Sequence, residues 1–192
     1  MKTIIKLSLL LIYLFSTDTL SAQPYEQVPE LNQYVGTWEW VSGSDKFQIV
    51  ITKQKLLTKN TNDQDYYRDR IVGWHSYTKN GQLVESSTDK SKNIYTTWMD
   101  AYDNSTLIGG NRMNDYDKIS MFFQDITRVG KVGEAILEVI AGEPSKLRWR
   151  LWGRDTVIFE DEPSPPSGWS VPTDLILTKK STPVPRPPDR IF

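Results

Sequence analysis

The chain has no cysteine and a single histidine, His75, among its 192 residues. Without cysteine there are no disulfide bonds, no thiolate zinc site, no cysteine nucleophile and no acylated cysteine of the kind that anchors a bacterial lipoprotein. A lone histidine also excludes a metal site built from several imidazoles. The sequence therefore predicts no metal site and no cofactor.

An excess of charge of either sign is also missing. The chain carries 23 Lys and Arg against 24 Asp and Glu, for a formal net charge of -1. This balance gives no bulk electrostatic reason to bind nucleic acid or an acidic membrane, so we expect neither partner. Aromatic residues are plentiful, with seven Trp, nine Tyr and six Phe. They supply the large apolar area that a core without disulfides needs.

Only the start of the chain holds a long hydrophobic run. Residues 1–22 open with Lys2 and Lys6, continue as an apolar run over residues 7–15, and end in small residues at Ala22. This pattern is typical of a secretory signal peptide. The run is shorter than the roughly 20 apolar residues of a membrane-spanning helix. We therefore expect an exported protein, periplasmic or extracellular, with no lipid anchor and no membrane insertion.

The remaining length suits one domain with a hydrophobic core. Residues 23–33 contain Pro24 and Pro29 among polar residues and predict an extended leader. Residues 34–180 are expected to form a single β domain. Residues 181–192 hold four prolines, which is typical of an extended or disordered tail.

Alternating apolar and polar residues, the period of a half-buried strand, mark most of the predicted elements. In residues 34–41, Trp38 and Trp40 share one face, and in the next segment Phe47 and Ile49 do the same. Further strands are predicted over residues 66–78, 82–87, 94–99, 107–108, 118–126, 135–139, 146–152 and 175–178, with polar turns at 42–45, 60–65, 79–81 and 100–104.

No segment has the apolar spacing of a convincing long helix. About eight to ten short strands joined by close turns predict an all-β fold, an antiparallel up-and-down barrel, with a β-sandwich as the alternative. A tight hairpin turn is predicted at Asn80-Gly81, since both residues tolerate the positive φ that such a turn requires.

Gly36-Thr37-Trp38, near the start of the β domain, resembles the Gly-x-Trp opening of the lipocalin-like (calycin) superfamily. The resemblance implies that Gly36 allows a tight bend at the base of the barrel and that Trp38 closes that end. It also implies a basic residue on a late strand packed over the Trp ring, and Arg148, Arg150 and Arg154 are the candidates.

The chain is also similar to small exported single-domain proteins of unknown function from Gram-negative bacteria. These open with a similar Gly-Thr-Trp and end in a short apolar strand followed by lysines, here residues 175–180. The likeness spans residues 31–180.

Aromatic and basic side chains supply the candidate binding site. Core filling explains most of the Trp residues, while one or two at a barrel mouth would form a stacking platform for a sugar or an apolar ligand. The basic stripe along residues 146–154 fits a solvated strand face or an anionic ligand. The candidate ligand-binding residues are Trp40, Trp74, Trp98, Trp149, Arg148 and Arg150.

No catalytic residue is assigned. His75 is interpreted as a hydrogen-bonded structural or exposed residue rather than a catalytic base. The paired acids, such as Asp63 and Asp65, are interpreted as solvated turn residues, because none matches a calcium loop.

Three functions remain open. The first is a noncatalytic exported protein that binds a small apolar or amphipathic ligand inside the barrel. The second is an envelope or surface interaction module that uses a sheet face or the Pro-rich tail to bind a partner. The third is a hydrolase, suggested only by the paired acids. Enzyme activity is the less expected outcome.

Overall fold

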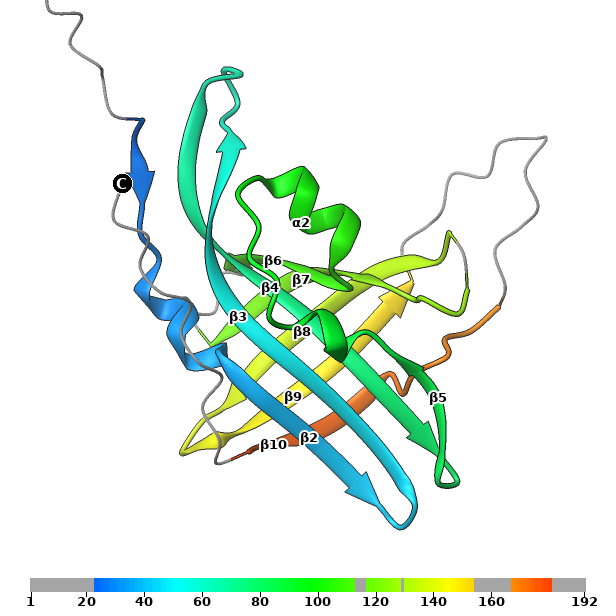
Figure 1. The fold of residues 1–192 in the computed structure, drawn as a ribbon. Coiled ribbons are helices and arrows are strands. Elements are labelled where there is room, and N and C mark those ends of the chain that lie inside the picture. Colours follow the sequence, from blue (N-terminus) through cyan, green and yellow to red (C-terminus); the bar gives the residue numbers. More distant parts are fainter. Residues whose placement is uncertain (1–22, 113–116, 129, 154–166, 181–192) are drawn as a thin grey trace, which may run out of the picture.

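The chain folds into a closed antiparallel barrel of eight strands (Figure 1). The computed structural model describes residues 23–112, 117–128, 130–153 and 167–180. The expected signal peptide, Arg154 and the expected Pro-rich tail lie outside the described residues. The prediction of an all-β, up-and-down barrel is confirmed, and the alternative of a sandwich is not adopted.

The wall of the barrel is continuous because its first and last strands pair. It closes where β10 pairs with β2 and where β4 pairs with β6. Two short strands, β1 (Tyr25–Glu26) and β5 (Gln82–Ser86), lie on the edge of β4 beyond its pairing with β6. The wall strands are β2 (Gly36–Ser42), β3 (Asp45–Lys59), β4 (Asp65–Lys79), β6 (Leu107–Arg112), β7 (Lys118–Gln124), β8 (Val132–Ile140), β9 (Glu143–Gly153) and β10 (Asp174–Lys179).

Side chains fill the barrel from the inward face of each strand. Phe47, Ile49 and Ile51 of β3 are fully buried, as the alternation in the sequence predicts. The largest inward side chains are Trp38 and Trp149, both without solvent exposure. The interior of the described barrel is therefore a packed core.

The 3-10 helix η1 (Pro29–Tyr34) closes one end of the barrel, which we call the base. Pro29 suits the first turn of a helix, where its missing N–H is not needed. The helix buries Leu31 and Tyr34, and the Tyr34 carbonyl accepts a hydrogen bond of 2.8 Å from Trp38 Nε1. The leader is thus not extended throughout: it is extended at β1 and helical before β2.

Lys179 covers Trp38 at the base. Its Nζ lies 5.0 Å from the centroid of the Trp38 ring, within range of a cation–π interaction. Gly36 has a φ of +137°, and a Cβ at this position would lie 2.9 Å from Lys179 Cε. The stem of the lysine therefore packs over the glycine while its ammonium group lies over the indole.

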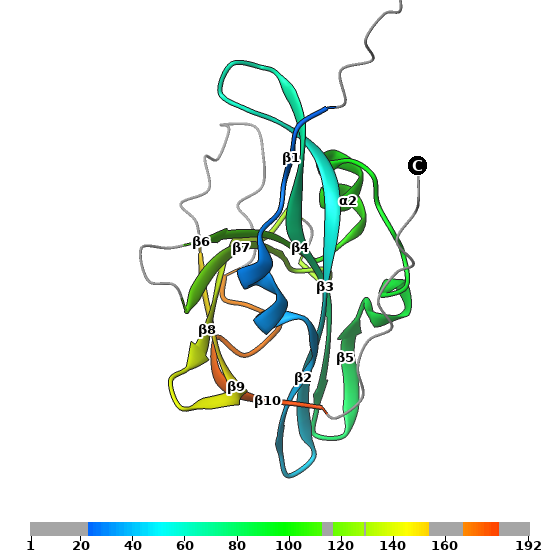
Figure 2. The same cartoon turned by 90° about the vertical axis from the view of Figure 1, so that its left-hand side faces the viewer.

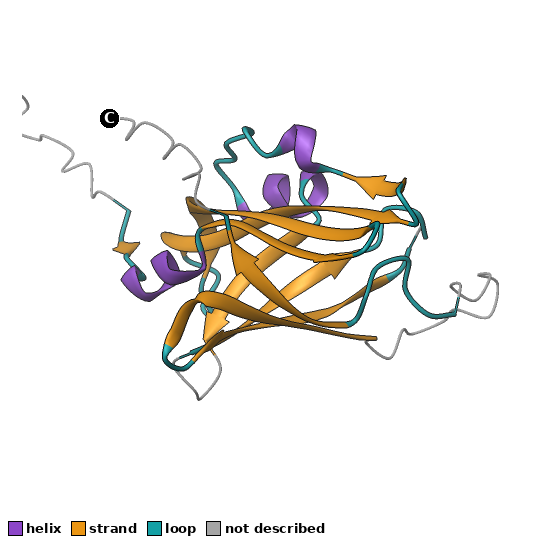
Figure 3. Cartoon of the chain, turned by 90° about the horizontal axis from the view of Figure 1, so that it is seen from below, coloured by secondary structure: helices purple, strands orange, loops and turns teal. Residues whose placement is uncertain are grey.

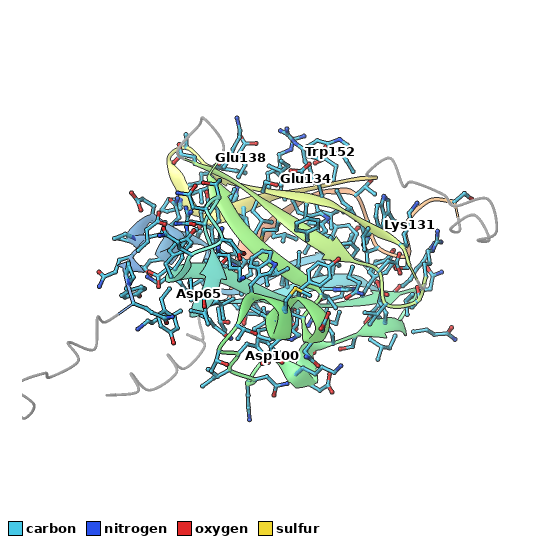
Figure 4. The ribbon with its side chains drawn as sticks, turned by 90° about the horizontal axis from the view of Figure 1, so that it is seen from above. Asp65, Asp100, Lys131, Glu134, Glu138 and Trp152 are labelled. Carbon is cyan, nitrogen blue, oxygen red and sulfur yellow. The ribbon has the colours of Figure 1, made fainter. Side chains whose placement is uncertain are left out.

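Arg148 and Arg150 do not take that role, which corrects the expectation from the sequence. Because Trp149 points inward, its two neighbours point outward. Arg148 pairs with Asp174 at 2.9 Å and Arg150 pairs with Glu138 at 3.2 Å. Figure 4 places Glu138 on the side of the barrel away from Asp100, the labelled residue of helix α2.

Helix α2 (Trp98–Asn104) covers the outside of the barrel (Figure 3). The strand predicted over residues 94–99 and the turn over 100–104 are wrong. Thr97 caps the helix, since its Oγ1 accepts the Asp100 N–H at 3.1 Å. Its apolar face and the outer face of the wall form a second core. The members of this core are Leu56, Val72, Trp74, Tyr95, Ala101 and Ile108, with Trp98, Tyr102 and Phe122 packed against them.

A second 3-10 helix, η2 (Thr88–Lys90), lies between β5 and α2. In the described part of the chain, no helix is both long enough and apolar enough to cross a membrane.

Strands β3 and β4 continue past the base as a two-stranded extension, with β1 alongside it (Figure 2). Asp69 of β4 joins β1 and the residues after it to this extension. Its carboxylate accepts hydrogen bonds from the Tyr25 hydroxyl at 2.6 Å and the Val28 N–H at 3.0 Å, and pairs with Lys53 at 3.1 Å. The residues that follow the expected cleavage point are therefore held against the extension.

We predict that Gly36→Ala lowers the free energy of unfolding by about 1–3 kcal/mol, because a residue with a Cβ is strained at this positive φ. The substitution also pushes the Lys179 stem away from the Trp38 ring. Urea denaturation measures the change. Gly153→Ala is the matched control, since its Cβ would meet nothing within 4 Å. Equal destabilisation by both variants would contradict this account of the base.

Candidate functional site

His75 lies inside the barrel on strand β4. Its inward orientation follows from its pairing with Ile49, whose side chain is part of the core. The imidazole is fully buried, with its centroid 4.9 Å from the Phe123 ring and 6.2 Å from the Phe47 ring. Burying two ring nitrogens among aromatic side chains is unfavourable unless both are hydrogen-bonded.

Both nitrogens have such a partner. His75 Nδ1 lies 2.9 Å from Thr106 Oγ1, and Nε2 lies 2.9 Å from Glu85 Oε1. Thr106 Oγ1 lies 3.2 Å from Ser87 Oγ, which also accepts the His75 backbone N–H at 3.1 Å. We call these four residues, together with Ser170, the polar cluster. The surroundings of His75 fit the structural interpretation made from the sequence.

The β4–β5 hairpin brings Glu85 to His75. Its turn residues, Asn80 and Gly81, have φ values of +52° and +76°, which confirms the predicted tight turn. Strand β5 then places Glu85 opposite Tyr77, whose side chain belongs to the barrel core. Residues opposite each other in a ladder share a face, so the carboxylate of Glu85 enters the barrel with Tyr77.

Residues 167–173, which form no helix or strand, cross the end of the barrel opposite the base. We call this segment the strap, and the end it covers the strap end. Ser170 ties the strap to the barrel at two points. Its Oγ donates to Glu85 Oε1 at 2.7 Å, and its N–H donates to Asp125 Oδ2 at 2.9 Å. One residue therefore joins the polar cluster to the cover of the barrel.

The strap also carries apolar side chains into the end of the barrel. Trp169 packs edge-on against Phe123, with 5.7 Å between the ring centroids, and Val171 is buried in the core. Trp149 Nε1 donates to the Pro172 carbonyl at 2.9 Å. Closure at this end therefore combines hydrogen bonds with aromatic contacts.

Asp125 is held in its ionised form beneath the strap. Burial raises the pKa of its carboxyl, but hydrogen bonds from Ser170 and from Thr127 outweigh that effect, so the pKa lies below its ordinary value of 3.8. Thr127 donates from its N–H at 3.1 Å and from its hydroxyl at 3.0 Å. Asp125 is thus a fixed acceptor for the strap.

The hydroxyl–imidazole–carboxylate order of Thr106, His75 and Glu85 is that of a nucleophilic triad. The threonine, however, is only 5% exposed, and the hollow beside it has a volume of about 10 Å³. That volume holds about one water molecule and leaves no room for a carbonyl substrate. Among the described residues, no group of three or more His, Asp or Glu side chains could hold a metal ion.

The residues proposed from the sequence as a ligand site lie in three separate places. Trp149 faces the interior and touches the strap, and Trp40 is half-buried on β2 and packs against the same core. Trp74 and Trp98 lie outside the barrel in the second core, under and within α2. Arg148 and Arg150 lie on the outer face in the ion pairs described above. Their role in binding stays a prediction.

Sequence reasoning missed the polar cluster and the strap. One signal was available: Ile119, Met121 and Phe123 alternate along β7, and Asp125 continues the same parity, which directs a carboxylate toward the barrel end. No comparable local pattern marks Ser170, whose partner Glu85 is 85 residues away in the chain.

Comparison with protein families adds one finding. Residues 1–180 match the model of DUF6705, a family of unknown function. The chain belongs to this family. No curated protein and no solved structure matches it. The family assignment covers the barrel, the polar cluster and the strap without naming a ligand, so the functional argument depends on the geometry.

We predict that Asp125→Asn lowers the free energy of unfolding at neutral pH, and that the difference from the unmodified protein shrinks in acid. The folded pKa lies below the unfolded one, so the carboxylate stabilises the fold above its ordinary value of 3.8. That stabilisation is lost as the pH falls through the lowered pKa of the folded state.

Urea denaturation at a series of pH values from 7 to 2 measures this difference. Asp63→Asn is the control, because the Asp63 side chain is 82% exposed in a turn. A difference between Asp125→Asn and the unmodified protein that stays constant down to pH 2 would show that the carboxylate charge is not what holds the strap.

Proposed function

We propose that this protein is an exported, noncatalytic, lipocalin-like binding protein that takes up a small apolar or amphipathic ligand at the strap end of its barrel. Export is proposed from the signal-peptide pattern of residues 1–22. The Gly36/Trp38 opening, with Lys179 of the last strand over the indole, supports the lipocalin-like interpretation.

The observation that carries the proposal is the unequal closure of the two ends. At the base, η1 runs almost directly into β2, and its Leu31 and Tyr34 are part of the core. At the other end, the strap has no regular structure, leads into β10 at Asp174, and is hydrogen-bonded to β9 at Thr173, whose carbonyl accepts the Leu151 N–H at 2.8 Å. Its Trp169 is only half-buried. In such a barrel a ligand would enter at the strap end, because the strap can move outward while the paired strands of the wall stay in place.

In the packed state, side chains of the strap occupy the position proposed for the ligand. Trp169 and Val171 lie against the core there, and moving them outward would expose the ring of Phe123 and the indole of Trp149. Aromatic faces of this kind suit an apolar chain or ring. Trp149 is the sequence-predicted residue best placed for ligand contact.

The alternative function, an envelope or surface interaction module, is favoured by a different observation. Trp152 and Ile176 are 45% and 43% exposed on the outer face of β9 and β10, close to the Arg148–Asp174 ion pair. Figure 4 shows Trp152 on the same side as Glu134 and Glu138. Exposed aromatic residues beside arginine are common at protein interfaces.

We predict that the unmodified protein binds N-phenyl-1-naphthylamine saturably, and that Trp169→Ala binds this apolar probe about tenfold or more tightly. Removing the indole relieves the competition between the strap and the probe, and a buried large apolar group is worth at least one factor of ten. Probe fluorescence measures both affinities.

Trp152→Ala is the matched control, since it removes an indole from the outer face of the same end of the barrel. Its affinity should equal that of the unmodified protein. If no protein binds the probe, the proposal of a ligand-binding barrel is wrong. If only Trp152→Ala loses binding, the outer face is the binding surface.

A further inference from the structure

Glu85 has one carboxylate oxygen in use and one left over. Oε1 accepts hydrogen bonds from Ser170 Oγ at 2.7 Å and lies 2.9 Å from His75 Nε2. Oε2 is buried and, among the residues that the structure describes, has no hydrogen-bond partner. The side chain has no solvent exposure. A buried carboxylate oxygen without a donor is rare and unfavourable, so a ligand donor that reached Oε2 would be bound favourably.

The neighbouring side chains that the structure describes give Glu85 Oε2 no free hydrogen-bond donor. Both ring nitrogens of His75 are engaged, and the Ser170 hydroxyl is already directed at the other oxygen of Glu85. Asp125 is a second acceptor under the same strap, joined to it through the Ser170 N–H. The oxygens of Asp125 are occupied by Ser170, Thr127 and Arg128, so Glu85 Oε2 is the unsatisfied acceptor among the described residues of the strap end.

We infer that Glu85 selects the ligand by its head group: an amphipath whose head donates a hydrogen bond, an alcohol or an ammonium, binds with that head on Glu85 Oε2. The inference rests on the proposed function and names its ligand class. A hydroxyl or ammonium hydrogen satisfies the vacant oxygen as the chain replaces the strap side chains.

The same arrangement disfavours a fatty acid. An ionised carboxylate has acceptors only, so its head would place a second acceptor against Glu85 Oε2 and leave that oxygen unsatisfied. The cations near the strap are engaged elsewhere: Arg128 Nε lies 3.8 Å from Asp125 Oδ2, and Lys131 Nζ lies 4.9 Å from the centroid of the Trp169 ring. A neutral head that only accepts, such as a methyl ether, would also leave Oε2 unsatisfied. The inference therefore distinguishes amphipaths with a donor head group from fatty acids and ethers of equal chain length.

Competition for bound N-phenyl-1-naphthylamine tests the inference on the full-length processed protein. The competitors are 1-decanol, decylamine, 1-methoxydecane and decanoate, which share a chain and differ in the head. We expect 1-decanol and decylamine to bind about tenfold or more tightly than the ether and the carboxylate, since a hydrogen bond to a charged acceptor is worth at least that factor.

Glu85→Gln sharpens the test, because its amide keeps an oxygen for His75 and Ser170 and places an NH₂ donor where Oε2 was. The order should change, with 1-methoxydecane and decanoate gaining affinity, decylamine losing it because an ammonium group only donates, and 1-decanol changing little because its hydroxyl can also accept. Glu143→Gln, an exposed position at the start of β9 near the base, is the matched control and should keep the original order. Circular dichroism reports whether each variant is folded.

Four outcomes have distinct meanings. If the probe and every competitor fail to bind, the proposed function is wrong, and this inference with it. If all four competitors bind equally well, ligand binding stands and the head-group selection is overturned. If Glu85→Gln folds and keeps the original order, Glu85 is not the selecting residue. If it does not fold, the order of the four competitors on the unmodified protein decides the matter.

Discussion

A carboxylate and an imidazole lie 2.9 Å apart within the barrel, and neither side chain has any solvent exposure. A pair of this kind is a poor source of stability, because removing two polar groups from water offsets much of what they gain from each other. Breaking it by removing one partner leaves the other buried and unsatisfied. The His75–Glu85 pair therefore constrains everything packed around it, including the position of the strap through Ser170.

The two ends of the barrel are closed by different interactions. The base uses a short helix that leads into the first wall strand, a buried indole and a lysine laid over that indole. The strap end uses hydrogen bonds to Glu85 and Asp125, with a half-buried indole on top. Hydrogen bonds of this kind can be exchanged for contacts with a ligand head group, and the core contacts of Trp169 and Val171 for contacts with its apolar chain. Opening the base would instead remove Leu31 and Tyr34 from the core.

Much of the wall could be predicted from the sequence, because strand burial has a period of two residues that is visible locally. The inward triplet Phe47, Ile49 and Ile51 and the turn at Asn80-Gly81 are examples. Helix α2 was missed because it is only seven residues long, too short for its apolar face to stand out from a strand pattern. Its burial depends on the outer face of a wall that closes through distant pairings.

The site was far less predictable than the fold. Thr106 is 31 residues from His75, and Ser170 is 85 residues from Glu85, so no short window contains the polar cluster. Two features decide that Lys179, and not one of the nearby arginines, covers Trp38. Arg148 and Arg150 lie on the outward-facing positions of β9, and β10 ends beside Trp38 at the base. Residue type suggested a cation over Trp38, but only the register of the closed barrel assigns it.

Amide hydrogen exchange of the processed protein, with and without saturating 1-decanol, tests the central claim most directly. If the strap is the movable cover of a ligand-binding barrel, the Ser170 amide, which donates to Asp125, will be protected in the free protein and exchange faster with the alcohol bound. The amides of β2 near Trp38 will be unchanged. Unaltered protection of the strap at saturation, or equal loosening of both ends, would contradict the account.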